Sequence, residues 1–202
     1  MQPRLIVQQK ITPFVNKYHM YGVNPDGSQA SSVGLAQQKR LAMKEKATIY
    51  SDDTKQTELC NFHAEKMMDI HGRYFVEDPQ GNLLGMFKKE FAASLLNSTW
   101  KILDSKGNEI LIIKESNATL AFLRRFVAYI PFVGEVADGL MAFLKYHFMF
   151  IDVSTQNKVG TYTKSTLFRD TYRLNMTDET WSKLDWRVYT AMCVPLDMLQ
   201  SR

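Results

Sequence analysis

Residue types that carry out catalysis occur in this chain, but their spacing matches no catalytic or metal-binding pattern. The four histidines form neither an HExxH motif nor a Cys/His pattern with metal-ligand spacing: His19, His63, His71 and His147. The sequence also lacks the GxSxG, GxxxxGKS/T and GxGxxG motifs that frame acyl transfer, nucleotide hydrolysis and dinucleotide binding. We therefore predict a non-enzymatic protein with no catalytic residue, no metal and no cofactor.

Paired carboxylates are explained better by turns than by acid–base chemistry. Glu77 with Asp78, and Asp52 with Asp53, stand between apolar runs, where an Asp side chain can hydrogen-bond the backbone that follows it. For the same reason, residues 104–109 are predicted to form a hairpin turn and not a calcium-binding loop.

Basic residues are the remaining candidates for chemistry, because ammonium and guanidinium groups bind anions. Adjacent pairs occur at Lys39 and Arg40, at Lys88 and Lys89, and at Arg124 and Arg125. The net charge of +4 and the pI of about 9.0 indicate a mildly basic surface that attracts anionic headgroups or nucleic acid. Nucleic acid is the poorer candidate, since basic residues alternate with acidic ones and no segment reads as a recognition helix.

The cysteines and the N-terminus indicate the compartment. Cys60 and Cys193 lie far apart in apolar contexts without CxxC spacing, which predicts buried free thiols in a reducing environment. The apolar run from Leu5 to Val7 is far shorter than a signal-peptide core. We expect a cytoplasmic protein.

The elements that must position these residues are mainly hairpins. An apolar run, an Asp-containing turn with Gly or Asn, and a second apolar run recur five times, most clearly over residues 73–87 and 100–113. The other copies begin near Tyr18, Thr48 and Phe148. One hairpin cannot bury its apolar face alone, so the copies must share a sheet.

The strand count predicts closure of that sheet. A lone first strand over residues 5–10, the five hairpins and a last strand over residues 169–175 give about twelve strands, and closure removes the sheet edges. We predict a single mainly β domain over residues 1–202: a twelve-stranded antiparallel barrel around a hydrophobic C-terminal helix. A sandwich with the helix packed outside it is the alternative.

The helix expected in the lumen spans about residues 178–199 and is apolar all round. Thr177 is its predicted N-cap, and Pro195 is expected to kink it or end its regular part. A substitution of Asp for Val188 or Met192 should therefore prevent folding.

A helical insertion is predicted over about residues 117–145, between the fourth and fifth hairpins. Charged residues interrupt its apolar runs, so none of these runs is long enough to span a membrane. It could lie on a membrane surface, with Phe126, Tyr129, Ile130 and Phe132 dipped in, or it could plug one end of the barrel.

With these features in place, the chain resembles the LURP-one-related family, which belongs with the tubby C-terminal domain and the phospholipid scramblases. The resemblance covers nearly the whole length. It rests on residues 5–10, on residues 74–85, on Lys88 and Lys89 followed by residues 98–100, and on the terminal helix. It implies the same barrel around a central helix.

The resemblance, the basic pairs and the insertion together lead to one functional expectation. We expect a barrel that binds anionic phospholipid, a phosphoinositide or the inner membrane surface peripherally. The expected headgroup ligands are Lys88, Lys89, Arg124, Arg125, Lys39 and Arg40. Two alternatives stay open: a protein-interaction or scaffold domain without lipid affinity, and a small-ligand carrier or enzyme that uses the barrel mouth.

Overall fold

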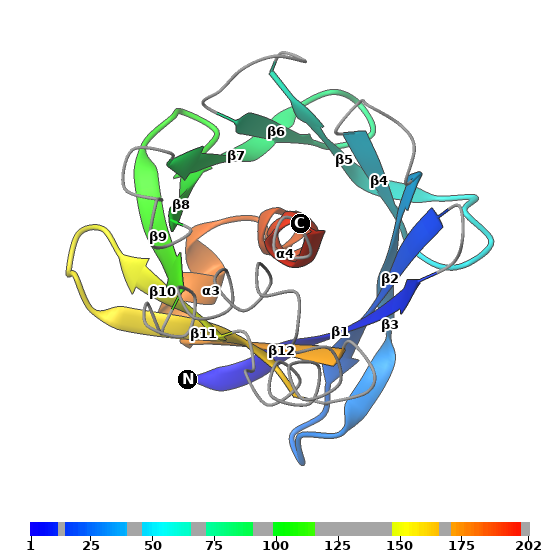
Figure 1. Cartoon of the computed structure of the whole chain (residues 1–202), viewed down its shortest axis with the longest axis horizontal. Helices are drawn as coiled ribbons and strands as arrows, with labels where there is room; N and C mark the ends of the chain where they lie inside the picture. The colour runs from blue at the N-terminus through cyan, green and yellow to red at the C-terminus, as the bar shows by residue number, and fades with distance from the viewer. Residues whose placement is uncertain are drawn as a thin grey trace, which may run out of the picture.

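Twelve antiparallel strands form a closed barrel in which each strand pairs with its neighbours in sequence and β12 pairs with β1 (Figure 1). The computed structural model describes residues 1–11, 15–39, 46–65, 72–90, 99–115, 147–165 and 171–198. The strands are β1 Gln2–Ile11, β2 Val15–Val23, β3 Gln29–Lys39, β4 Lys46–Tyr50, β5 Glu58–Ala64, β6 Arg73–Glu77, β7 Leu83–Glu90, β8 Thr99–Asp104, β9 Glu109–Glu115, β10 His147–Asp152, β11 Lys158–Lys164 and β12 Thr171–Met176.

One end of the barrel, which we call the turn end, is built from five hairpin turns that share one chemistry. Each turn carries an Asp whose side chain accepts hydrogen bonds from backbone N–H groups two to four residues later. The first four of these residues follow one another at equal intervals: Asp26, Asp52, Asp78 and Asp104, with Asp152 as the fifth. The hairpin repeat is therefore strictest in its turns.

The turns at Asp78 and Asp104 show why this pattern specifies a hairpin. In both, the Asp Oδ1 accepts the backbone N–H of the Asn four residues later at 2.8 Å, and that Asn donates its side-chain Nδ2 to Oδ2 at 2.8 Å. Gly81 and Gly107 precede the Asn residues with φ of 85° and 91°, a conformation that side chains disfavour. The spacing of Asp, Gly and Asn therefore fixes the shape of these two turns and the register of the strands that they join.

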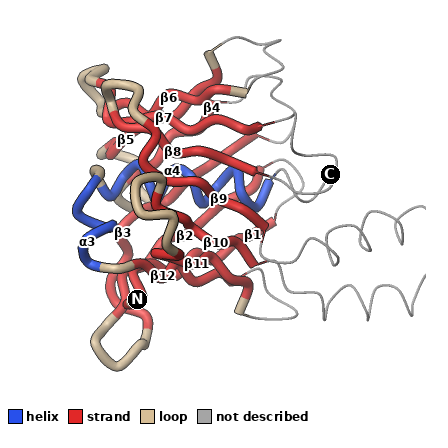
Figure 2. The backbone as a smooth tube through the Cα atoms, turned by 90° about the vertical axis from the view of Figure 1, so that its left-hand side faces the viewer, coloured by secondary structure: helices blue, strands red, loops and turns tan. Residues whose placement is uncertain are grey.

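The lumen is filled by the C-terminal segment, as predicted. Helix α3 (Asp178–Lys183) lies at the turn end, and helix α4 (Trp186–Met198) runs through the middle of the barrel (Figures 1 and 2). Its side chains are buried on all sides: Val188, Tyr189, Thr190, Ala191, Met192, Cys193, Val194 and Leu196 are at most 1% exposed. Both cysteines are buried free thiols, as expected, and burial raises the pKa of each to about 12.

The prediction of one continuous helix is wrong in one respect. Leu184 is extended, with φ −133° and ψ 161°, and separates α3 from α4. Asp185 then begins a second helix, because its Oδ1 accepts the backbone N–H of Arg187 at 2.9 Å. Thr177 caps α3 through Thr180, as predicted, and α4 continues past Pro195 to Met198.

The remaining fold predictions are confirmed by the barrel, the five hairpins and the pairing of the first with the last strand. The predicted last strand, residues 169–175, corresponds to β12, and its residues 169 and 170 lie outside the described residues. The predicted insertion, residues 117–145, lies outside the described residues. No helix among the described residues is long and apolar enough to cross a membrane.

A candidate anion-binding rim

The end of the barrel opposite the turns, which we call the rim, is formed by the strand ends that lead into residues 12–14, 40–45, 66–71, 91–98, 116–146 and 166–170. Basic residues lie near these strand ends: Lys10, Lys17, Arg73, Lys88, Lys89, Lys101, Lys114 and Lys164. The acidic side chains described there are Glu65, Glu90 and Glu115, and Glu109 at the start of β9 reaches Lys88 and Lys101. The rim, as far as it is described, is therefore basic.

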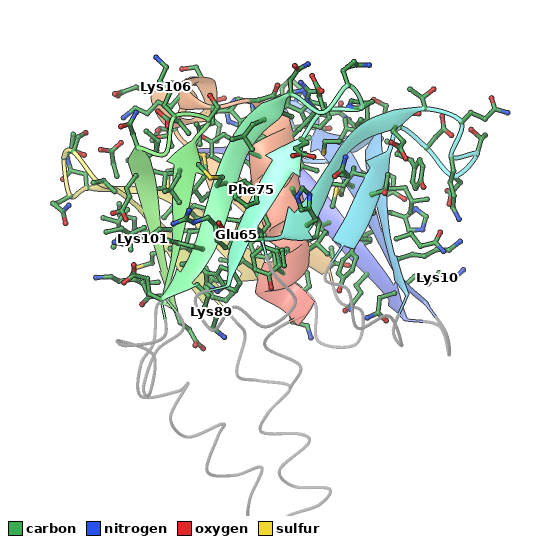
Figure 3. The ribbon with its side chains drawn as sticks, turned by 90° about the horizontal axis from the view of Figure 1, so that it is seen from above. Lys10, Glu65, Phe75, Lys89, Lys101 and Lys106 are labelled. Carbon is green, nitrogen blue, oxygen red and sulfur yellow. The ribbon has the colours of Figure 1, made fainter. Side chains whose placement is uncertain are left out.

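The turn end has the opposite charge. Its acidic residues are Asp26, Asp52, Asp53, Glu58, Glu77, Asp78, Asp104, Glu109, Asp152, Asp178, Glu179 and Asp185. Its basic residues are Arg4, Lys55, Lys106, Lys158, Lys183 and Arg187. Figure 3 shows Lys106 at this end, and Lys10 and Lys89 at the rim on different sides of the barrel.

Turn chemistry explains much of this polarity. Asp is selected in the turns because its carboxylate satisfies backbone N–H groups there. The side-chain hydrogen bonds from Asn82 and Asn108, together with those from the backbone, lower the pKa of Asp78 and Asp104. Other carboxylates at the turn end hold the helices: Lys183 Nζ lies 2.5 Å from Asp152 Oδ2, and Arg187 Nη2 lies 2.7 Å from Asp185 Oδ2. Arg4 pairs with Asp178. These carboxylates therefore stabilise the turns and the attachment of the helices.

A row of three cations crosses the outer wall near the rim. In the strand register Arg73 lies opposite Lys88, and Lys88 lies opposite Lys101. Cations directly opposite one another destabilise a sheet unless counter-ions lie between them.

Carboxylates supply those counter-ions. Lys88 Nζ lies 2.9 Å from Glu109 Oε1, and Lys101 Nζ lies 2.9 Å from Glu109 Oε2 and 3.1 Å from Glu90 Oε1. Arg73 Nε lies 3.9 Å from Glu65. Hydrogen bonding between Lys101 and Glu109 raises the pKa of the lysine and lowers that of the glutamate. This row is neutralised within the protein.

A second pair of opposed cations has no such neutralisation by the residues that the structure describes. Lys10 on β1 lies directly opposite Lys17 on β2. Their side chains point outward, because their neighbours Val7, Tyr18 and Met20 point into the core. Neither lysine has an ion pair or hydrogen bond with any described residue, and the same holds for the exposed Lys114 on β9.

The structure separates the residues that the sequence grouped. Lys88 points outward into the neutralised row, whereas Lys89 points to the other face, with its Nζ 5.8 Å from the centre of the buried Trp100 ring. Lys39 ends β3, with β4, β5 and β6 between that strand and β7. Arg40, Arg124, Arg125, Phe126, Tyr129, Ile130 and Phe132 lie outside the described residues. The structure does not test these headgroup assignments, which stay predictions.

Sequence reasoning missed Lys10, Lys17 and Lys114, which are isolated in the sequence. The signal that could have found the first two is the hairpin register: Lys10 and Lys17 stand symmetrically about the β1–β2 connection. Among the described residues, no group of three or more His, Cys, Asp or Glu side chains is placed to hold a metal ion.

The fold defines a class of protein, a closed twelve-stranded antiparallel barrel whose lumen holds a C-terminal helix. The chain belongs to the LURP-one-related family, whose sequence pattern it matches over residues 34–197. We found no significant match among curated proteins or among solved structures.

Proposed function

We propose that this barrel binds anionic phospholipid surfaces through its rim. The observation that carries the proposal is the opposite charge of the two ends, with basic residues at the rim and acidic residues at the turns. Anionic leaflets attract basic residues with about 1 kcal/mol per Lys or Arg near the surface. The rim therefore faces the membrane, and the acidic turn end faces away from it.

The position of the predicted membrane-contact segment supports the same orientation. Residues 116–146 follow Glu115, the last residue of β9, and precede His147, the first residue of β10. Both of these residues lie at the rim. A rim that faces the bilayer therefore puts both described ends of this segment on the membrane side, and its sequence carries Arg124, Arg125, Phe126, Tyr129, Ile130 and Phe132.

The test is co-sedimentation with vesicles of neutral and of phosphatidylserine-containing composition, at low and high salt. We expect binding only to the anionic vesicles, and less of it as salt shortens the Debye length. The rim variant K10E/K17E/K114E should lose this binding. The matched control is K55E/K106E/K158E, which makes the same change in net charge at three exposed lysines of the turn end and should keep most of it.

Equal loss in the rim variant and its control would mean that net charge and not the rim governs binding, and would contradict the proposal. Absence of binding to every vesicle would also contradict it. That outcome would favour a protein-interaction domain, and a partner with an acidic surface would be the next candidate for the rim.

A further inference from the structure

We propose that Lys10 and Lys17 form a clamp for a phosphomonoester, the dianionic phosphate group of a lipid headgroup or of a free phosphate ester. This inference rests on the proposed function, since it names the chemistry that one part of the rim selects. Its starting observation is the direct opposition of the two lysines on β1 and β2.

The row of opposed cations on β6, β7 and β8 is a comparison within the same sheet. There the sheet also places cations opposite one another, and Glu109 contacts Lys88 and Lys101 at 2.9 Å each. At Lys10 and Lys17 no described carboxylate takes that position. Among the described residues, the same strand geometry thus has an internal counter-ion in one place and none in the other, where an anion from outside can take the position.

Lys17 makes no hydrogen bond to its neighbour on β3. On its other side Lys17 lies opposite Gln37 of β3, and the buried Oε1 of Gln37 has no hydrogen-bond donor. The ammonium group of Lys17 therefore does not donate to this neighbour. Half-burial of the Lys17 side chain limits where that ammonium group can lie.

The ligand that suits two opposed lysines is a small anion with about two negative charges. Opposed side chains on neighbouring antiparallel strands have Cβ atoms about 5 Å apart, so two ammonium groups can contact one small anion. A phosphomonoester carries about −1.5 to −2 charges and three acceptor oxygens, which suits two lysines. A phosphodiester or a carboxylate carries a single charge and neutralises one of them.

The nearest described residues on the same face do not balance the charge of Lys10 and Lys17. The next opposed pair toward the turn end is Gln8 and His19. Gln8 donates to Gln29, and His19 faces Asp53 at 3.6 Å. The described carboxylate nearest to the clamp on this face, that of Asp53, therefore faces His19, one pair away from the clamp.

The test compares vesicles containing phosphatidic acid, a phosphomonoester, with vesicles containing phosphatidylserine at equal zeta potential. We expect the wild-type protein to bind the phosphatidic acid vesicles about tenfold more tightly, the effect of one hydrogen bond to a charged group. K10Q and K17Q should each remove this preference, and the double variant should remove no more, because the lysines act on one ligand. K114Q and the turn-end control K106Q/K158Q should keep the preference.

Equal wild-type affinity for the two vesicle types would overturn the clamp and leave the proposed function standing, provided that binding remains sensitive to salt and to rim charge. Additive effects of K10Q and K17Q, matched by K114Q, would also overturn it. If neither vesicle binds, the proposed function fails, and a titration with glycerol 3-phosphate followed by amide NMR decides the clamp separately. Saturable shifts at Lys10 and Lys17 that vanish in K10Q/K17Q would support the clamp for a free phosphate ester, and absence of shifts would overturn it.

Discussion

The turn end and the rim of the barrel place charged side chains in different relations to the fold. At the turn end, carboxylates cap turns and hold the helices: Asp104 satisfies backbone N–H groups, and Asp152 binds Lys183 of α3. At the rim, Lys10, Lys17 and Lys114 have no counter-ion among the described residues. Charge at the turn end therefore contributes to stability, whereas part of the charge at the rim is available to a ligand.

The row of Arg73, Lys88 and Lys101 shows that proximity to the rim alone does not make a cation available. Its members have carboxylates close by, so their charge is balanced within the wall. The useful distinction is between cations with and without an internal counter-ion. Substitutions that remove one kind of charge and leave the other test that distinction, and the largest effect is expected in helix α4.

Val188→Asp should have the largest effect, because it places a charge in the lumen. Val188 is fully buried in the first half of α4 and contacts the position of Gly85 on β7. Burial of a carboxylate without a partner costs several kcal/mol, comparable to the whole stability of a domain. We expect no soluble folded protein. Val188→Ala is the control and should remain folded with a lowered melting temperature; a soluble V188D protein with unchanged melting would contradict the central-helix architecture.

Asp152→Asn should destabilise the protein by about 2 kcal/mol at neutral pH, the scale of hydrogen bonds to a charged group. The Asp152 carboxylate is buried, and it accepts bonds from Lys183, from the Ser154 hydroxyl at 2.5 Å and from the Thr155 N–H at 3.0 Å. Urea denaturation measures the loss. Vesicle binding should not change, because this residue lies at the turn end.

The pH dependence of that difference follows from the pKa of Asp152. The ion pair with Lys183 holds this pKa well below its usual value, so folding favours the charged carboxylate. The contribution is then fully present above the unfolded-state pKa of about 3.9 and is lost only as pH falls below it toward the folded-state pKa. The stability difference between wild type and D152N should be constant from about pH 7 to pH 5. A difference that already shrinks in this range would contradict the assigned ion pair.

Much of the fold could be predicted because its signals are local. Each hairpin is specified by a turn of a few residues, as at Asp78, Gly81 and Asn82, and pairing of consecutive hairpins leaves only the closure of β1 on β12 to infer. The break at Leu184 was missed because the apolar spacing continues across it. Asp185, a good N-cap placed before Trp186, was the available signal.

The candidate site was harder to predict, because contacts across strands depend on register. Lys88 and Lys89 are adjacent in sequence, but successive residues in a strand point to opposite faces, so the pair divides between the outer wall and the lumen. Lys10 and Lys17 are separated in sequence and meet through the hairpin. Two basic residues that are adjacent in a strand therefore point to opposite faces and cannot bind one ligand together, although a search for adjacent basic residues selects them.

Removal of the internal ion pair should affect stability and not lipid binding. K88Q/E109Q keeps the net charge and deletes the ion pairs of Glu109 with Lys88 and with Lys101, both at 2.9 Å, while Lys101 keeps Glu90. We expect a loss of about 0.5–1 kcal/mol, since these groups are partly exposed. K10Q should behave in the opposite way, with no loss of thermal stability and with binding to anionic vesicles weakened roughly fivefold. Thermal melts and co-sedimentation of both variants give the comparison. Loss of vesicle binding in K88Q/E109Q would assign the headgroup site to Lys88 after all.

The smallest effect should be a gain. Lys17→Gln removes repulsion between directly opposed lysines and should stabilise the protein by about 0.3 kcal/mol at low ionic strength, as measured by urea denaturation. High salt screens this repulsion, so the gain should shrink as sodium chloride is added. Lys106→Gln, at an exposed turn position, is the control and should change stability little. A destabilised K17Q would show that the lysine already has a favourable partner in the free protein, and the rim would then have no unbalanced pair at this position.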